Sequence, residues 1–503
     1  MNLARTLHYA AERAPDAEAI VDGELRITYS RLRDRASRLA GGLAALGVGR
    51  GDPVATVLKN RHENVELFWA CQWLGAQFVP LSWRNPPSAV EYCVVDAGAD
   101  VVVFEPVSED HAAAVEGSGA VLVAAAGSSK DRTFDGLLES EAIDGALDLA
   151  DSSTAIMLYT SGTTGRPKGV PRSHRAERAA GMSQALQHGY VPWERTLGVM
   201  PLYHTMGDHS MIAMSLLAGC YVCQSDWEAG EGLAQVEREQ ITSLYLAPTL
   251  FHDLVNHPGV GNRDLSTVRA LGYAGAAMTG ALVERCASAF DTDVFVNHYG
   301  STEIYTYTIG RRQVEKPGNA GRASVNALIR LVSVGDGAGP EDLVGTGEDG
   351  QILCHMTSPE AFGGYWKRPD ADAKAVRSGW FFTGDLGRID NDGDMWIVGR
   401  SDDMINSGGE NIHPLEVEDV LTRAPGVSEV AVFGIPDERL GQQVVASVVV
   451  GPGVTAESLD AFCLASPNLA RYKRPREYRI VESLPKSASG KILRRVLREG
   501  ETT

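Results

Sequence analysis

Strand-like runs alternate with amphipathic helical stretches through the first 310 residues of this chain. Pro53–Leu58 and Asp100–Phe104 are short and almost wholly apolar, which is typical of buried strands. Tyr29–Leu43 instead places its apolar residues at helical spacing. In such an alternation the strands form a mostly parallel sheet and the helices cover its faces, so the pattern predicts an α/β fold.

The pattern changes after about residue 320, where short strands and turns form a small β-barrel-like unit. A polar stretch at Gly399–Asp403 ends this unit. Beyond it, Pro414–Leu421 has a helical pattern and Val427–Phe433 a strand pattern. We therefore expect a large N-terminal domain over residues 1–401 and a small α+β domain over residues 402–503.

Composition excludes several classes of protein. The net charge of −19 over 503 residues disfavours a nucleic-acid coat or a polybasic membrane binder, so we expect no nucleic-acid partner. Seven scattered cysteines form no disulfide pattern, and Cys220 and Cys223 lie in an apolar run that favours simple burial. The N-terminus lacks the apolar core of a signal peptide, and no apolar run is long enough to span a membrane. These features predict a cytoplasmic protein, and Gly117–Lys130, rich in Ala, Gly and Ser, is predicted to be a surface connection.

The strongest local signal is Leu158–Val170, with the sequence LYTSGTTGRPKGV. Glycines let backbone N–H groups approach a phosphate, hydroxyls add hydrogen bonds, and Lys168 adds a positive charge. The segment is no Walker A loop, because the GxxxxGK[S/T] pattern is absent. Its composition alone suits any flexible loop, but the order of its residues favours a phosphate-binding loop.

Two later segments carry groups that suit a nucleotide and its metal ion. Asn297–Glu303 ends a strand in a glycine turn, and the carboxylate of Glu303 beside a phosphate loop suits Mg²⁺. Trp380–Asp385 places Asp385 at a strand–turn corner, where it can accept hydrogen bonds from both ribose hydroxyls. Arg400 follows fifteen residues later.

The C-terminal stretch is basic on an otherwise acidic chain. Residues 471–503 hold ten Lys or Arg against four Asp or Glu, and Pro485–Arg495 contains a lysine next to a glycine. This stretch is either a solvated basic surface or a cap that meets an anionic ligand.

Taken in order, these motifs resemble the adenylate-forming superfamily of acyl- and aryl-CoA synthetases, luciferases and peptide-synthetase adenylation domains. The resemblance covers essentially the whole chain. The matching segments are Tyr159–Gly169, Tyr299–Glu303, Thr383–Asp385, Gly399–Arg400 and Ser489–Lys491. It implies an AMP-forming ligase that converts a carboxylic acid into an acyl-adenylate with ATP and Mg²⁺, after which coenzyme A displaces AMP. Further similarity to benzoate- and 4-chlorobenzoate-CoA ligases favours an aromatic acid.

The resemblance also implies roles at the nucleotide, residue by residue. Phosphates would be held by Thr160, Ser161, Gly162, Thr163, Thr164, Gly165 and Lys168, and adenine by Tyr299, Gly275 and Ala276, with Thr302 beside them. Asp385 and Arg400 would fix the ribose, and Glu303 would hold Mg²⁺. Lys491 would bridge the α-phosphate and the reacting carboxylate during adenylation.

In this superfamily the C-terminal domain rotates between the half-reactions, which places a hinge at Asp402 and makes the small domain mobile. Rotation would withdraw Lys491 and bring a glycine-lined passage to the acyl site for the thiol of coenzyme A. The implied contacts with coenzyme A are Gly408, Gly409, Tyr472, Lys473 and Arg474.

The acyl pocket implied by the resemblance is lined by His204, Thr205, Met206, Tyr245, Ala274, His298, Gly300, Tyr305 and Thr306. Tyr245 and Tyr305 would close a long alkyl tunnel and favour a flat ring. His298 and Thr306 are more polar than the aliphatic lining expected for a halogenated ring, which leaves room for a hydroxyl, amino or heterocyclic acid. His204 is either a catalytic gate or a structural histidine, and Gly181 is expected to enlarge the pocket.

Other functions stay open at this stage. The chain could activate a medium-chain fatty acid, or it could load a carrier protein instead of free coenzyme A. A regulator that binds nucleotide without chemistry is disfavoured, because Glu303, Asp385 and Lys491 are all present. The sequence also leaves open whether the chain forms a homodimer.

Overall fold

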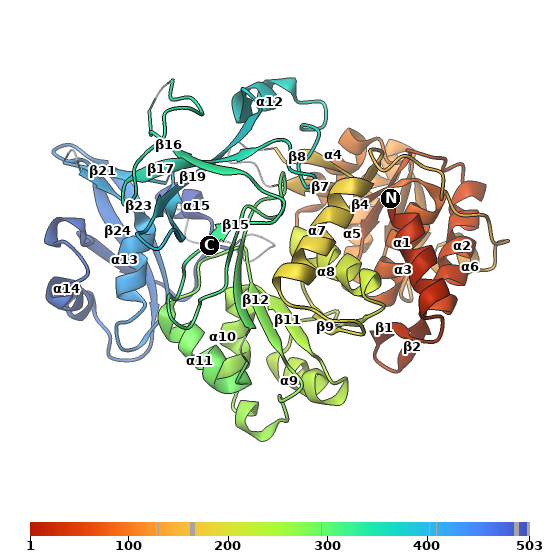
Figure 1. The fold of residues 1–503 in the computed structure, drawn as a ribbon, viewed down its shortest axis with the longest axis horizontal. Coiled ribbons are helices and arrows are strands. Elements are labelled where there is room, and N and C mark those ends of the chain that lie inside the picture. The colour runs from red at the N-terminus through yellow and green to blue at the C-terminus, as the bar shows by residue number, and fades with distance from the viewer. Residues whose placement is uncertain are drawn as a thin grey trace.

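The computed structural model describes residues 1–503 except 129, 161–165, 293, 336, 402, 409, 487–491 and 500–503. Within these residues the strands form four sheets, and helices cover the two largest. Figure 1 shows the N-terminal helices α1–α6 at one end of the molecule and the C-terminal sheet with α13 and α14 at the other. The α/β fold expected from the alternating pattern is confirmed.

The first sheet has the strand order β6-β5-β3-β4-β7-β8. Neighbouring strands are parallel except β7 and β8, which form an antiparallel pair. The strands are β3 (Pro53–Val57), β4 (Gln77–Pro80), β5 (Val101–Phe104), β6 (Val121–Ala124), β7 (Thr154–Thr160) and β8 (Lys168–Ser173).

The second sheet has nine strands in the order β15-β14-β13-β12-β11-β9-β10-β1-β2 among the described residues. Its central strands are parallel, while an antiparallel hairpin from the N-terminus closes one edge. The strands are β1 (Glu18–Asp22), β2 (Leu25–Thr28), β9 (Arg195–Gly198), β10 (Cys220–Cys223), β11 (Ser243–Leu246), β12 (Ala270–Tyr273), β13 (Val294–Tyr299), β14 (Thr308–Gly310) and β15 (Arg322–Ala323).

Helices α7 and α8 lie between these two sheets. Helix α7 contacts β7 and β8, helix α8 contacts β9, β10 and β11, and the two helices pack on each other. Buried side chains on these elements belong to several apolar cores. The larger helices and short segments before residue 300 are α1 (Leu3–Arg13), α2 (Tyr29–Ala45), α3 (His62–Leu74), α4 (Pro87–Ala97), α5 (Glu109–Val115), α6 (Phe134–Leu138), α7 (His174–Gln187), α8 (Thr205–Leu216), α9 (Ala229–Arg238), α10 (Pro248–Asn256) and α11 (Gly280–Phe290), with 3₁₀ turns at Pro106–Ser108, Glu116–Ser118 and Val260–Asn262.

The other two sheets are mainly antiparallel and follow residue 320. The β-rich unit contains β16 (Ile329–Val332), β17 (Asp349–His355), β18 (Val376–Arg377), β19 (Trp380–Ile389), β20 (Met395–Arg400) and helix α12 (Pro369–Ala375). The C-terminal part contains β21 (Ile405–Ser407), β22 (Glu410–Ile412), β23 (Val427–Asp437), β24 (Gly441–Val450), β25 (Glu477–Ile480), α13 (Pro414–Leu421), α14 (Ala456–Ala465), α15 (Arg494–Glu499) and a 3₁₀ turn at Arg471–Lys473. The predicted hinge residue, Asp402, lies outside the described residues, so the division at residues 401 and 402 stays a prediction.

Local signals explain most of the element boundaries. Helix α2 begins where the side chain of Thr28 accepts a hydrogen bond from the backbone N–H of Arg31, and helix α3 ends at Gly75 in the left-handed conformation. One prediction was wrong: residues 121–124, inside the expected surface connection, form β6 and pair with β5. The short apolar run VLVA is stabilised by this edge pairing, which the surrounding glycines and serines concealed.

Cys220 and Cys223 are buried in β10, as the apolar run around them predicts. None of the described helices is long and apolar enough to cross a membrane.

Candidate active site

A cleft lies among the β7–β8 hairpin, the end of β13 and the β-rich unit, and it reaches the C-terminal sheet. The structure brings most of the predicted nucleotide residues to its wall. The predicted residues that line it are Thr160, Lys168, His204, Gly275, Ala276, His298, Tyr299, Gly300, Thr302, Glu303, Asp385, Arg400 and Lys473. Ser161, Gly162, Thr163, Thr164, Gly165, Asp402, Gly409 and Lys491 lie outside the described residues.

The β7–β8 hairpin positions the two described ends of the predicted phosphate loop. Thr160 ends β7 and Lys168 begins β8, and the two residues are paired across the hairpin. The ammonium of Lys168 lies 4.2 Å from the centre of the Tyr365 ring, in a cation–π contact. A cation is therefore held at the base of the predicted loop, where it can reach a phosphate.

Asp385 stands at the centre of the predicted ribose site. Strands β19 and β20 place Asp385 opposite Arg400, whose Nη1 donates to Oδ1 of Asp385 at 3.0 Å. The hydroxyl of Tyr299 donates to Oδ2 of Asp385 at 2.6 Å. This contact joins the end of β13 to the β-rich unit, so residues 86 positions apart meet in one wall of the cleft.

Glu303 presents a carboxylate to the same cleft. Its Oε1 accepts from the hydroxyl of Tyr365 at 2.6 Å, and its Oε2 accepts from Oγ of Ser301 at 2.7 Å. Carboxylate oxygen is the ligand type that Mg²⁺ prefers, so this residue fits the predicted metal role. Tyr365 links Glu303 to Lys168, and the sequence carries no local signal for it because it follows Glu303 by 62 residues.

A buried arginine, Arg172, supports the loop that carries Glu303. Its Nη1 donates to the backbone oxygens of Thr302, Glu303 and Glu360 at 3.3, 3.0 and 2.7 Å. Its Nε donates to Glu177 at 2.7 Å, and both side chains are fully buried. Sequence reasoning missed Arg172, because nothing in the run PRSH indicates a contact with residues 130 positions away.

His204 caps the first turn of α8. Its Nδ1 accepts from the backbone N–H of Met206 at 3.3 Å, which places the proton of the neutral ring on Nε2. The residue also lines the cleft. The structural role of His204 is thus present, and its role as a gate stays a prediction.

The predicted acyl-pocket residues gather behind the cleft wall, where Met206, Tyr245, Ala274, Tyr305 and Thr306 are buried and Thr205 is partly exposed. A Cβ added to Gly300 would lie 1.8 Å from the backbone oxygen of Tyr305, so the chain passes too close there for any other residue. The hydroxyl of Tyr305 donates to Oδ2 of Asp208 at 2.9 Å.

The prediction that Gly181 enlarges the acyl pocket was wrong. The side chain of Ile212 occupies the space beside this glycine, since an added Cβ would lie 2.8 Å from Cγ2 of Ile212. The glycine allows α7 and α8 to approach each other and does not enlarge the pocket.

The predicted coenzyme A contacts differ in their exposure and in their hydrogen-bond partners. Tyr472 is 45% exposed, whereas Lys473 donates to both oxygens of Glu416 at 2.9 and 2.8 Å. Arg474 donates to Asp460 at 2.8 Å. Gly408 adopts a left-handed conformation with φ of 64°. In this arrangement, the two cations are held by carboxylates of their own domain.

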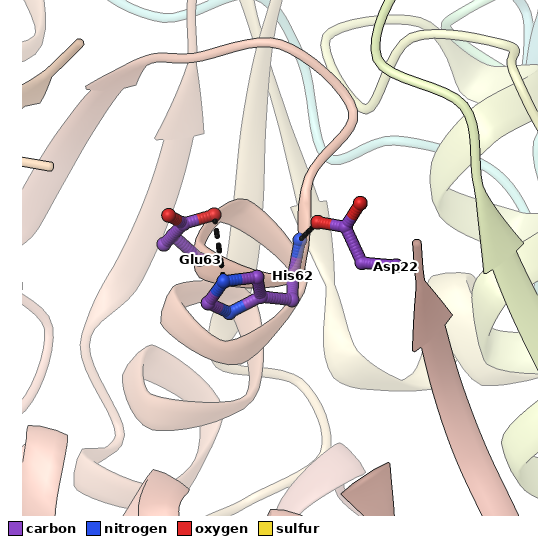
Figure 2. A group of neighbouring side chains, drawn as sticks. All are labelled: Asp22, His62 and Glu63. Atoms are coloured by element: carbon purple, nitrogen blue, oxygen red, sulfur yellow. Dashed lines mark hydrogen bonds and ion pairs between the residues drawn. The ribbon is translucent and has the colours of Figure 1, made fainter. Parts of the chain in front are cut away.

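Apart from Glu303, two groups of described side chains have metal-ligand chemistry. Figure 2 shows the first, in which the ring of His62 points toward Glu63 and its backbone N–H toward Asp22. The N–H donates to Asp22 at 3.0 Å, while the ring nitrogens lie 3.3 Å from Glu63 and 2.7 Å from Glu66. Burial alone would lower the pKa of His62, but the hydrogen bond with Glu66 and the surrounding carboxylates raise it. The group is therefore an ion-pair network that fixes the start of α3 to the end of β1.

The second group consists of three carboxylates on one acidic turn. Lys316 forms ion pairs with all of them, namely Asp390, Asp392 and Asp394. The lysine supplies the positive charge at this turn, so the cluster joins the β-rich unit to the segment after β14.

Comparison with known proteins identifies the family. Residues 7–366 match the model of the AMP-binding enzymes, and residues 416–491 match the model of their C-terminal domain. The chain belongs to the AMP-binding enzyme family.

Relatives align with this chain over nearly its whole length. A feruloyl-CoA synthase from an Amycolatopsis species is 35% identical over 96% of both chains. A 4-chlorobenzoate–CoA ligase from an Arthrobacter species is 32% identical, covering 98% of this chain and 94% of its own. The structure of O-succinylbenzoate coenzyme A synthetase from Bacillus subtilis with ATP and magnesium ion superimposes with a TM-score of 0.85 at 27% identity, covering 97% of this chain and 98% of that one.

The predicted class is thereby confirmed at the level of the family. The protein is an AMP-forming acid–CoA ligase, a class that uses ATP, Mg²⁺ and coenzyme A. The large N-terminal and small C-terminal parts of its fold agree with the same neighbours.

Proposed function

We propose that this ligase activates an aromatic carboxylic acid. The observation that supports this most is the ring of buried aromatic side chains behind Gly300. Tyr245 and His298 pack with their ring centres 5.5 Å apart, and Tyr305 lies on the same pocket under the guanidinium of Arg172. Aromatic rings packed in this way favour a flat ring over a long alkyl chain as the bound group. Feruloyl-CoA synthase and 4-chlorobenzoate–CoA ligase, both named for ring acids, are relatives over the full chain.

The contacts around the cleft also support a nucleotide site. Lys168 and the loop over residues 160–165 bind the phosphates, and Glu303 holds Mg²⁺, which offsets the charge of ATP when it is bound. Asp385, fixed by Arg400 and Tyr299, accepts the ribose hydroxyls. The attack of a carboxylate on a phosphate joins two anions, so these cations lower its barrier.

The C-terminal domain supplies the remaining groups. Lys491 bridges the α-phosphate and the carboxylate in the first half-reaction. Rotation about Asp402 then replaces it with Gly408 and Gly409, which line the approach of the thiol. Tyr472 is exposed and able to stack on the adenine of coenzyme A, while Lys473 and Arg474 reach its phosphates by leaving Glu416 and Asp460.

The experiment that tests the proposal measures pyrophosphate release with ATP and Mg²⁺, with and without coenzyme A. The acids are benzoates, hydroxy- and aminobenzoates, cinnamates, heteroaryl acids and C4 to C12 fatty acids. We expect turnover with ring acids that requires coenzyme A. A preference for fatty acids would refute the aromatic assignment. Turnover only with a phosphopantetheine carrier protein would refute coenzyme A as the thiol that accepts the acyl group.

Two further predictions concern the whole protein in the cell. A cytoplasmic location is checked by fractionation, and a homodimer by light scattering at micromolar concentration.

A further inference from the structure

Three buried histidines lie at the inner end of the proposed acyl pocket. His188 directly follows the last residue of α7, His209 lies on α8, and His298 lies on β13. Each is at most 2% exposed. Helix α8 starts in the cleft at His204 and runs inward, which places His209 roughly 7.5 Å further along the helix axis.

Hydrogen bonds determine the protonation of two of these rings. Nε2 of His298 lies 3.2 Å from the backbone oxygen of Tyr305, so this nitrogen carries a proton and Nδ1 accepts. Nε2 of His188 lies 3.2 Å from that Nδ1 and therefore donates to it. Nδ1 of His188 is then the acceptor that faces the hydroxyl of Tyr190 at 3.5 Å. Both rings are neutral, and the chain from Tyr190 to Tyr305 uses all four of their nitrogens.

His209 has no such partners. Its ring is 1% exposed, and neither nitrogen forms a hydrogen bond with any described residue. The ring is enclosed by Tyr245, His298 and Tyr305, with ring centres 5.5, 5.4 and 5.1 Å away. A buried imidazole with one N–H and one lone pair unused is costly, because water at the same groups is lost. A ligand group that hydrogen-bonds one of these nitrogens would remove part of this cost.

We propose that His209 binds an uncharged hydroxyl group on the ring of the acid substrate, so that the enzyme selects hydroxylated aromatic acids. This inference rests on the proposed aromatic specificity. A hydroxyl either donates to the acceptor nitrogen of a neutral imidazole or accepts from its N–H, so one ring hydroxyl pairs one of the two nitrogens of His209. A chlorine or hydrogen at the same place leaves both ring nitrogens unpaired.

A second carboxylate on the acid is disfavoured at this place. Burial and the neighbouring His298 and His188 lower the pKa of His209, so the ring stays neutral. The buried guanidinium of Arg172 is already bound to Glu177 and to three backbone oxygens. Nη2 of Arg172 has no hydrogen-bond partner among the described residues, but the charge of this guanidinium is already balanced by Glu177.

The test compares kcat/KM for matched acids in the full-length enzyme with ATP, Mg²⁺ and coenzyme A. The pairs are 4-hydroxybenzoate with benzoate and 4-hydroxycinnamate with cinnamate, and 4-chlorobenzoate and terephthalate are added. We expect the hydroxy acid of at least one pair to exceed its parent roughly tenfold or more, since a site built for a hydroxyl rejects the analogue that lacks it. Terephthalate and 4-chlorobenzoate should not exceed benzoate.

His209→Leu should abolish this ratio, so that the hydroxy acid is turned over no better than its parent, because the hydroxyl loses its partner. His8→Leu on α1 is the matched control and should keep the wild-type ratio. A hydroxyl preference that survives in His209→Leu would overturn the assignment of the residue. If His209→Leu does not fold, the ratio measured for the wild-type enzyme still decides. Equal kcat/KM values for the hydroxy acids and their parent acids would overturn the inference. Turnover of fatty acids with no ring acid accepted would overturn the proposed function itself.

Discussion

Replacing Arg172 with methionine tests whether this buried arginine holds the loop that carries Glu303. The substitution leaves Glu177 buried without its partner and removes the donor to three backbone oxygens. Removal of one member of a buried ion pair costs about 3–5 kcal/mol. We therefore expect the free energy of unfolding to fall by about 3–5 kcal/mol. We also expect kcat/KM for ATP to fall roughly 10- to 100-fold, because Glu303 loses its fixed position.

The loss of stability should also depend on pH. Burial raises the pKa of Glu177, and the charge of Arg172 offsets part of that rise. Without Arg172 the folded-state pKa lies further above the unfolded value, so the folded state binds a proton that the unfolded state releases as pH increases. The deficit of Arg172→Met should therefore be larger at pH 8 than at pH 5.

Urea unfolding and steady-state kinetics at both pH values measure these effects. Arg175→Met, an exposed substitution on the helix that carries Glu177, is the control and should change stability by less than about 0.5 kcal/mol. Arg172→Met combined with Glu177→Gln should recover part of the loss, since no buried charge remains. A loss below about 1 kcal/mol with unchanged ATP kinetics would refute the supporting role of Arg172.

Three further predictions concern single residues. Lys491→Ala should lower adenylate formation on the order of 100-fold or more and spare thioester formation from a supplied acyl-adenylate; equal losses in pyrophosphate exchange and in AMP release would contradict its role. Gly300→Ala should lower the free energy of unfolding by about 1–3 kcal/mol in urea titrations, because its Cβ would overlap the backbone of Tyr305; wild-type stability would disprove the close approach. His62 has a raised pKa, so its stabilisation is complete below about pH 6.5 and is lost as pH rises through the folded-state pKa. Thermal melting should thus separate His62→Gln from wild type more at pH 6 than at pH 9, and an equal difference at both would exclude a charged His62.

The amino-acid sequence alone determined the class of this enzyme and much of its fold. Local patterns reach only a few residues, and within that range they were sufficient: the helix expected at Pro414–Leu421 has those bounds, and β3 and β5 fall inside their predicted runs. The ordered motifs also predicted that Asp385, Arg400 and Tyr299 share one site, and hydrogen bonds join these three side chains.

Only the tertiary structure decided which distant side chains meet behind those motifs. Arg172 reaches the loop at Glu303 because β8 passes beside this loop. Tyr365 reaches Glu303 from the connection between β17 and α12. His188 directly follows α7, His209 lies on α8 and His298 on β13, and they become neighbours only when α7 and α8 pack between the sheets. A sequence pattern records the local periodicity of each element but not the packing between elements, so the polar groups that meet inside the pocket could not be predicted from it.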